Sequence, residues 1–224
     1  KKSTDVLEKL QEESVIREEG VSYFFFNEDE IEVQTLIKNQ TVSLDDKYRD
    51  FYNEFFQPMT SVKTKVHYGV NDFSFSISVD DKVFNPRGDF KLQVVFQSEA
   101  TPEELAFDAS RKDLLVCVHE WFQQDAELRR DFDKYCKTVK YLMNNSSGAT
   151  GSRANTNSNF RTRNNELRDK LLQKFTERFA TTSFVSLQQV IQGKDLPAAK
   201  AKDRLEQVMQ KHIGDIYNKH TLSE

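Results

Sequence analysis

The clearest hydrophobic pattern in the chain lies between residues 113 and 142. An uninterrupted apolar run at residues 114–118, Leu-Leu-Val-Cys-Val, has the length and the charged flanks of a strand that is buried on both faces. The segment after it is amphipathic, with the i, i+4, i+7 spacing of one helix face at Leu128, Phe132, Tyr135, Val139 and Leu142. A buried strand followed by a helix that packs on the sheet is half of a βαβ unit. This stretch is therefore predicted to join a sheet to its covering helix.

Alternation of apolar and polar residues with a period of two predicts three strands before that run. The cleanest alternation covers residues 73–79, and weaker ones cover residues 62–68 and 90–96. One apolar and one polar face is typical of antiparallel strands with one side in water. A helix is predicted at residues 44–56, ending before Pro58. We therefore predict an α+β fold, with a mixed, mostly antiparallel sheet and helices packed on it.

The beginning of the chain predicts a helix, a β-hairpin that turns at Gly20, and a second helix. A helix that runs into a hairpin is how a winged-helix domain ends, so residues 1–42 are predicted to be a partial winged-helix element. Other small domains contain the same succession. DNA binding by this wing is disfavoured, because Glu18 and Glu19 at its turn would repel phosphates.

The second helix is predicted from the spacing of Asn27 and Glu30, which matches a capping box. The helix would run to about residue 37. An alternation of apolar and polar residues at Ile31, Val33 and Thr35 leaves a strand open as the alternative.

Residues 43–224 are predicted to form one α+β domain with a flexible loop at residues 144–159. That stretch is dominated by Asn, Ser, Thr and Gly, a composition typical of exposed connections. A helix is predicted at residues 160–179, followed by a short strand within residues 183–191 and a last helix from Pro197.

The charges nearly balance over the whole chain, with 32 Lys and Arg against 36 Asp and Glu and a formal net charge of −4. This balance argues against a dedicated nucleic-acid binder. The two cysteines, Cys117 and Cys136, predict no disulfide framework and a reducing, cytoplasmic compartment. No window approaches the ~18 uninterrupted apolar residues of a membrane span, so no membrane contact is expected. The chain starts at Lys1 without a methionine, and we expect it to be a piece of a longer protein.

Catalytic chemistry is not predicted at any residue. The glycine-rich segment at residues 148–153 lacks the spacing and the lysine of a phosphate-binding P-loop, Gly-x-x-x-x-Gly-Lys-Ser/Thr. His119 has no second histidine at the helical spacing of a zinc protease, and Cys117 is too buried for a reactive thiol. The neighbouring carboxylates Asp80 and Asp81 are predicted to be solvated. We therefore predict no catalytic, cofactor-binding or metal-binding residue.

One cluster of charges is a candidate surface. Basic residues run through the predicted loop and the helix after it, against few acidic ones. They are Arg153, Arg161, Arg163, Arg168, Lys170, Lys174 and Arg178, against Glu166, Asp169 and Glu177. A solvated helix face is the ordinary interpretation of such a pattern. The functional interpretation is a basic surface for a nucleic-acid backbone or an acidic protein partner.

Four segments resemble one protein family. They read Leu-Leu-Val-Cys-Val at residues 114–118, Leu-Arg-Arg-Asp-Phe at 128–132, Lys-Thr-Val-Lys-Tyr-Leu at 137–142 and Arg-Asn-Asn-Glu-Leu-Arg at 163–168. These segments resemble the large P-loop protein of BREX phage-resistance systems, the BrxC/PglY family. In that family a strand precedes a helix that ends in lysine–threonine–x–lysine–tyrosine–leucine, and a helix with an asparagine–glutamate core follows a variable loop. The resemblance is best over residues 110–192, and its motifs are structural.

The resemblance implies a parent protein that is an AAA-like ATPase with its Walker motifs in its N-terminal part. None of those motif residues matches this chain, so ATP and magnesium are expected to bind the parent elsewhere. The expected partners are other BREX proteins, including the methyltransferase, with DNA as a further candidate; an oligomer is compatible with the resemblance. The expected function is a non-catalytic interaction or coupling module of that ATPase in phage defence. The alternative is a nucleic-acid-binding module that uses the basic helix around residues 153–178.

Overall fold

The computed structural model describes residues 2–12, 16–19 and 21–220, and the chain divides into two compact units. The helical unit comprises Lys1–Ser43 and Asp131–Arg168, and the sheet unit comprises Leu44–Arg130 and Asp169–Glu224. The first boundary lies close to the predicted division after residue 42. Residues 131–168, which the sequence assigned to the α+β domain, belong to the helical unit instead.

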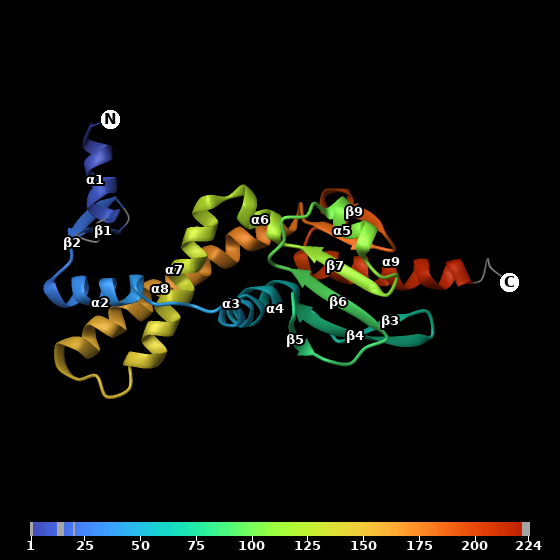
Figure 1. The fold of residues 1–224 in the computed structure, drawn as a ribbon, viewed down its shortest axis with the longest axis horizontal. Helices are drawn as coiled ribbons and strands as arrows, with labels where there is room; N and C mark the ends of the chain where they lie inside the picture. The colour runs from blue at the N-terminus through green and yellow to red at the C-terminus, as the bar shows by residue number, and fades with distance from the viewer. Residues whose placement is uncertain (1, 13–15, 20, 221–224) are drawn as a thin grey trace. The chain divides into compact units, whose positions relative to one another are not determined.

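The helical unit begins with a helix, a hairpin and a second helix (Figure 1). These elements are α1 (Lys2–Glu12), β1 (Ile16–Glu19), β2 (Ser22–Phe25) and α2 (Glu28–Lys38). The two strands pair antiparallel, with Ile16 opposite Phe25, so the predicted hairpin is confirmed. Gly20 at its turn and the side chains of Glu18 and Glu19 lie outside the described residues. The partial winged-helix element stays a prediction.

Helix α2 starts at the predicted capping box. The Glu30 N–H donates to Asn27 Oδ1 at 2.8 Å, and the Asn27 N–H donates to Glu30 Oε2 at 3.1 Å. The box provides hydrogen-bond partners for two backbone N–H groups that have no partner within the helix. Residues 28–38 are therefore helical, and the alternative strand prediction for Ile31, Val33 and Thr35 is wrong. One face of α2 then enters a core shared with α7 (Ala126–Asn145) and α8 (Gly151–Phe179). The members of this core are Val33, Ile37, Tyr141, Leu142 and Phe160.

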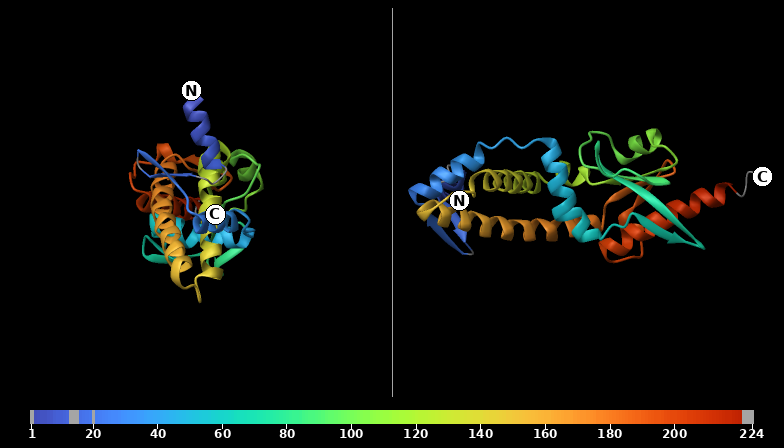
Figure 2. Two further views of the ribbon diagram at one scale, coloured as in Figure 1. Left: turned by 90° about the vertical axis from the view of Figure 1, so that its left-hand side faces the viewer. Right: turned by 90° about the horizontal axis from the view of Figure 1, so that it is seen from below.

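The flexible loop predicted at residues 144–159 is shorter in the structure, because α7 continues to Asn145 and α8 begins at Gly151. Thr156 and Asn157 are buried, and polar contacts hold this part of α8 to α7. The Tyr141 hydroxyl bonds Asn157 Oδ1 at 3.2 Å, and Asn157 Nδ2 donates to the Asn145 carbonyl at 3.1 Å. Figure 2 shows the two helices side by side. Hydrogen bonds of this kind leave no apolar periodicity in the sequence, so composition alone predicted a loop.

The described part of the sheet unit contains a mixed sheet of seven strands. Its order is β3-β4-β6-β7-β8-β9, and β5 also pairs with β4. The β4–β6 and β6–β7 pairs are parallel and the other four are antiparallel, which confirms the mixed, mostly antiparallel sheet of an α+β fold. The strands are β3 (Lys65–Tyr68), β4 (Asn71–Val79), β5 (Lys82–Asn85), β6 (Phe90–Val95), β7 (Asp113–Cys117), β8 (Ser183–Ser186) and β9 (Gln189–Gln192).

Helices pack on both faces of this sheet. Helix α5 (Pro102–Asp108) covers the face that carries Val95, Leu115 and Val185. Helix α9 (Ala201–His220) lies on the opposite face, where His212 contacts Phe90. The apolar run predicted as a buried strand is β7, and its central position in the sheet explains why residues on both of its faces are buried.

Aromatic side chains fill the core between the sheet and the remaining helices of this unit. These helices are α3 (Leu44–Phe51), α4 (Gln57–Thr60), α6 (His119–Gln124) and the last turns of α8. Helix α3 continues through a π-helical segment (Tyr52–Phe56) into α4, so it does not end before Pro58 as predicted. The Gln57 N–H bonds the Tyr52 carbonyl five residues back, and Pro58 lies in the first turn of α4, where a missing N–H is tolerated.

Candidate functional site

The basic residues predicted as a surface are spread along α8, and Arg163 is tied most firmly into the helical unit. Its Nη2 donates to Glu30 Oε1 at 2.9 Å, and the Glu30 side chain is only 6% exposed. The guanidinium also lies over the rings of Phe26 and Phe160, 5.7 and 5.4 Å from their centroids. A charge held by a buried carboxylate and two aromatic faces serves to attach α8 to α2.

A second contact between the same helices involves Arg153. Its Nη2 donates to Glu32 Oε2 at 2.6 Å. This hydrogen bond is the largest cause of a raised pKa of Arg153, and a hydrogen bond with Tyr141 is the second. The neighbouring Ser152 hydroxyl bonds the Asp29 carboxylate. The acidic start of the chain and the basic start of α8 are therefore partners within one unit, although the sequence shows them only as two regions of opposite charge.

The other predicted basic residues divide into paired and outward-facing ones. Arg178 Nη2 donates to Asp125 Oδ2 at 3.0 Å and Lys174 Nζ to Glu127 Oε1 at 3.4 Å, both within the sheet unit. Arg168 is partly buried in the helical unit. Arg161 is exposed and donates to Ser146 Oγ at 3.0 Å. Lys170 is exposed, with no ion pair among residues 2–12, 16–19 and 21–220.

The glycine-rich segment at residues 148–153 does not fit a nucleotide phosphate. A P-loop presents backbone N–H groups and a lysine to the phosphates. Here Gly151 begins α8, and the side chains that follow it bind the carboxylates of Asp29 and Glu32. Two carboxylates at this place would repel a phosphate, so no nucleotide contact is assigned to the segment.

His119 and Cys117 are both buried. His119 is the first residue of α6 and is 2% exposed, with its Nε2 3.0 Å from the Ala100 carbonyl. Cys117 is fully buried in β7, and burial raises the pKa of its thiol to about 12. The thiol therefore stays protonated at neutral pH.

Asp80 has a structural role that the sequence did not reveal. It lies in the turn after β4 with a φ of 46°, and its carboxylate accepts the N–H groups of Phe96 and Gln97 at 2.8 and 2.9 Å. Burial raises the pKa of Asp80, and these two hydrogen bonds act against that rise. Asp80 is thus half-buried and joins the end of β4 to the end of β6, whereas Asp81 is exposed as predicted.

A buried Ser–His pair also went unnoticed in the sequence. His212 of α9 is 0% exposed, and its Nδ1 lies 2.7 Å from Ser186 Oγ of β8. The Lys112 carbonyl faces the imidazole, although no hydrogen bond of standard geometry reaches Nε2. Both side chains are buried, and the pair joins α9 to β8 of the sheet. The only sequence signal was the place of His212 on the apolar stripe of the last helix.

We expect the stability of the chain to fall as the pH drops below about 6.5, the ordinary pKa of histidine. Burial lowers the pKa of His212, while the Lys112 carbonyl, Asp113 and Asp215 act in the opposite direction. Between about 6.5 and the lower folded-state pKa, the unfolded chain binds a proton that the folded chain does not. The slope from this group is at most about 1.4 kcal/mol per pH unit.

Urea unfolding between pH 5 and 8, with the His212→Asn variant alongside, measures this contribution. Asn retains a polar atom for Ser186 but does not titrate, so its stability curve should be flatter than that of the unchanged chain. Parallel curves for the two proteins would rule out His212 as the source of the pH dependence.

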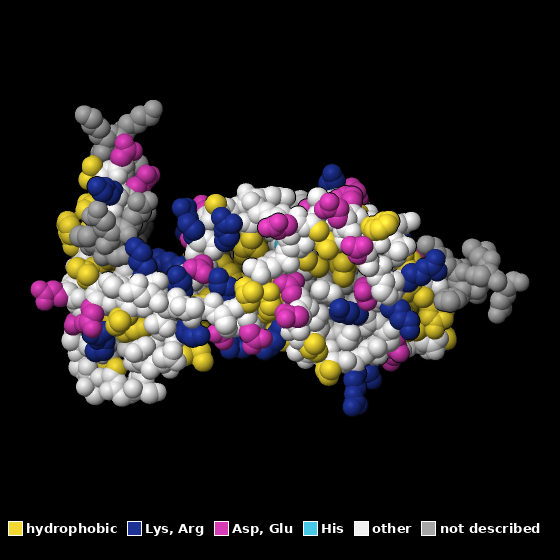
Figure 3. All heavy atoms as spheres, in the orientation of Figure 1, with side chains coloured by type: hydrophobic (Ala, Val, Ile, Leu, Met, Phe, Trp, Pro, Cys, Tyr) yellow, Lys and Arg dark blue, Asp and Glu magenta, His cyan; other side chains and the backbone are white. Residues whose placement is uncertain are grey.

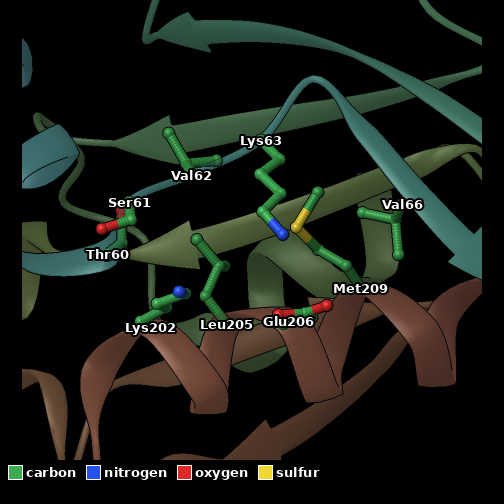
Figure 4. Close-up of a pocket in the computed structure, with 9 residues that line it drawn as sticks. All are labelled: Thr60, Ser61, Val62, Lys63, Val66, Lys202, Leu205, Glu206 and Met209. Carbon is green, nitrogen blue, oxygen red and sulfur yellow. The ribbon is translucent and has the colours of Figure 1, made fainter.

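One hollow lies in the sheet unit beside the end of α4 (Figure 4). It encloses about 260 Å³, including space open to solvent. Val66, Leu205 and Met209 supply apolar lining, and the ammonium groups of Lys63 and Lys202 flank it together with the carboxylate of Glu206. The mixed charges and small apolar lining give the hollow no defined chemistry.

Two further findings concern the described residues alone. Among them, no group of three or more His, Cys, Asp or Glu side chains is placed to hold a metal ion. No helix in this part of the chain has both the length and the apolar character needed to cross a membrane.

Comparison with known proteins identifies a family. The family model of the BREX ATP-binding protein BrxC 4th domain, described as having a six-stranded beta sheet, matches residues 40–212. The matched residues include every strand of the path β3-β4-β6-β7-β8-β9. No curated protein and no solved structure matches the chain. Because the family match covers more than half of the sequence, the chain belongs to the BrxC family of BREX ATP-binding proteins and has a role in BREX phage defence.

Proposed function

We propose that this chain is a non-catalytic interaction module, which couples the ATP-binding part of a BrxC protein to other BREX proteins. The observation that carries the proposal is the match of residues 40–212 to a fourth domain of an ATP-binding protein. The sequence of this domain contains no Gly-x-x-x-x-Gly-Lys-Ser/Thr motif. ATP and magnesium would then bind elsewhere in the parent protein.

The internal ion pairs support an interaction module over a nucleic-acid binder that uses the whole basic face of α8. Four of the predicted basic residues are engaged by acidic side chains of their own unit: Arg153, Arg163, Lys174 and Arg178. Such pairs use charge to fix helices in place, which leaves a folded body that can present surfaces to other proteins.

Two experiments test the proposal. Titration of the chain with ATP and magnesium in a calorimeter should give no binding heat; measurable binding would contradict the assignment of ATP to another part of the parent. Overproduction of the chain in cells with a complete BREX system should lower phage resistance, because the free module competes for BREX partners.

The matched control for the second experiment is the destabilised variant Phe175→Ala, which populates the folded module less. This variant should lower phage resistance less than the unchanged chain does. Cells that produce the unchanged chain, cells that produce the variant and cells that produce neither protein are compared for phage plating. Equal plating on all three would argue against the coupling role.

A second candidate function is nucleic-acid binding, and the outward charges of Arg161 and Lys170 favour it. Affinity for duplex DNA should then fall with salt at a log–log slope of about −0.9 for each phosphate neutralised. Arg161→Glu and Lys170→Glu should each weaken binding to all sequences alike. The control is Arg129→Glu, which makes the same charge change at an exposed position on α7. Equal losses in all three variants would exclude a specific surface on α8.

A further inference from the structure

The β1–β2 hairpin exposes an unusual amount of apolar surface. All four residues of β2 are exposed, including Tyr23 at 42%, Phe24 at 44% and Phe25 at 74%. Val21, just before the strand, is 100% exposed. Successive residues of a strand point to opposite faces, so both faces of this two-stranded sheet carry exposed aromatic rings.

Helix α1 precedes the hairpin in the same unit, and its Val6 is 57% exposed. Figure 3 shows apolar side chains gathered over α1 and the hairpin. An isolated two-stranded hairpin is marginally stable in water, and a third strand or a covering layer is what stabilises such a sheet. Several exposed apolar side chains gathered near one hairpin mark a surface that another protein part covers.

The position of the hairpin in the chain indicates what covers it. Phe26, the residue after β2, turns inward and stacks on Phe160 at a centroid distance of 6.3 Å. The family match begins only at residue 40, so the hairpin precedes the matched domain. The matched domain is described as the fourth of its protein, so earlier domains of a BrxC polypeptide lie on the N-terminal side of the matched residues.

We propose that Val21, Tyr23, Phe24 and Phe25 form the docking surface for the domain that immediately precedes the fourth domain in the BrxC chain. That domain supplies an apolar cover, with a strand added beside β1 or β2 to complete the sheet.

Amide hydrogen exchange tests whether the preceding BrxC domain covers the hairpin. The exchange of residues 16–25 is compared between this chain and the same chain extended through the preceding BrxC domain. The extended protein should show exchange slowed by about tenfold or more at these residues. Unchanged exchange overturns the proposal. The proposal is also overturned if hairpin exchange in the shorter chain becomes slower as the protein concentration rises. The surface would then be covered by a second copy of the chain.

Variants of the extended protein test whether Val21 and Phe25 make the contact with the preceding domain. Val21→Ser and Phe25→Ser change exposed side chains, so the fold, checked by circular dichroism, should be retained. Both should return the exchange of the hairpin to the rate of the shorter chain. The matched control is Phe107→Ser, at an 83% exposed phenylalanine of α5, which should leave the protection intact. Protection that persists in Val21→Ser and Phe25→Ser contradicts docking through these side chains.

Discussion

Replacing Phe175 by alanine should destabilise the chain by about 3–5 kcal/mol, the cost of removing a fully buried phenylalanine ring. Phe175 is 0% exposed at the centre of the aromatic core of the sheet unit. Its ring centroid lies 5.1 Å from that of Phe55, 5.4 Å from that of Phe51 and 5.6 Å from that of Trp121. Rings held from several sides cannot collapse into the space left behind, so a cavity remains. Equilibrium unfolding in urea measures the loss.

The control for this substitution is Phe107→Ala. The Phe107 side chain is 83% exposed on α5, so its removal should change stability by no more than about 0.5 kcal/mol. Similar losses at the two positions would show that the aromatic core does not carry the stability assigned to it.

Substitution Glu30→Gln should cost about 2–3 kcal/mol, because it leaves the guanidinium of Arg163 without its buried counter-ion. This cost lies below the range of about 3–5 kcal/mol typical of a broken buried pair, because the Arg163 side chain is 27% exposed. Glutamine can still accept the Asn27 N–H of the capping box, so the variant removes the charge and keeps the cap. A double-mutant cycle with Arg163→Gln, read from urea unfolding, isolates the energy of the pair.

The neighbouring pair of Glu32 and Arg153 is the matched control. Its carboxylate is 59% exposed, and Glu32→Gln should therefore cost no more than about 1 kcal/mol. Equal costs for Glu30→Gln and Glu32→Gln would show that burial does not set the strength of these contacts.

Elements that depend on local patterns were predictable from the sequence. The run at residues 114–118 matches β7, because a strand at the centre of a sheet needs apolar side chains on both faces. The alternation at residues 73–79 matches β4 for a related reason, since one of its faces enters the core and the other is partly exposed. Asn27 and Glu30 form the predicted capping box, which requires only two residues three positions apart.

Features that depend on distant residues were not predictable. Glu30 and Glu32 lie 133 and 121 residues before their arginine partners, so no local window shows that two arginines of α8 are paired with acidic residues. The same reason explains the helical conformation of residues 151–159. Their polar side chains bind α7 and α2, and neither composition nor periodicity reports such contacts. The candidate surface stays a prediction on α8, and the division of its residues into paired and outward-facing ones required the structure.

The insertion of residues 131–168 between neighbouring strands has a consequence for synthesis of the protein. Leu114 of β7 pairs with Ser186 of β8, and the helical excursion through α7 and α8 separates the two in the chain. On the ribosome, β7 therefore emerges well before the strand that covers its edge. Until β8 follows, this apolar strand presents unpaired N–H and C=O groups, the feature that promotes edge-to-edge aggregation. Nascent chains that stall between Asn145 and Ser183 should consequently depend most on chaperones.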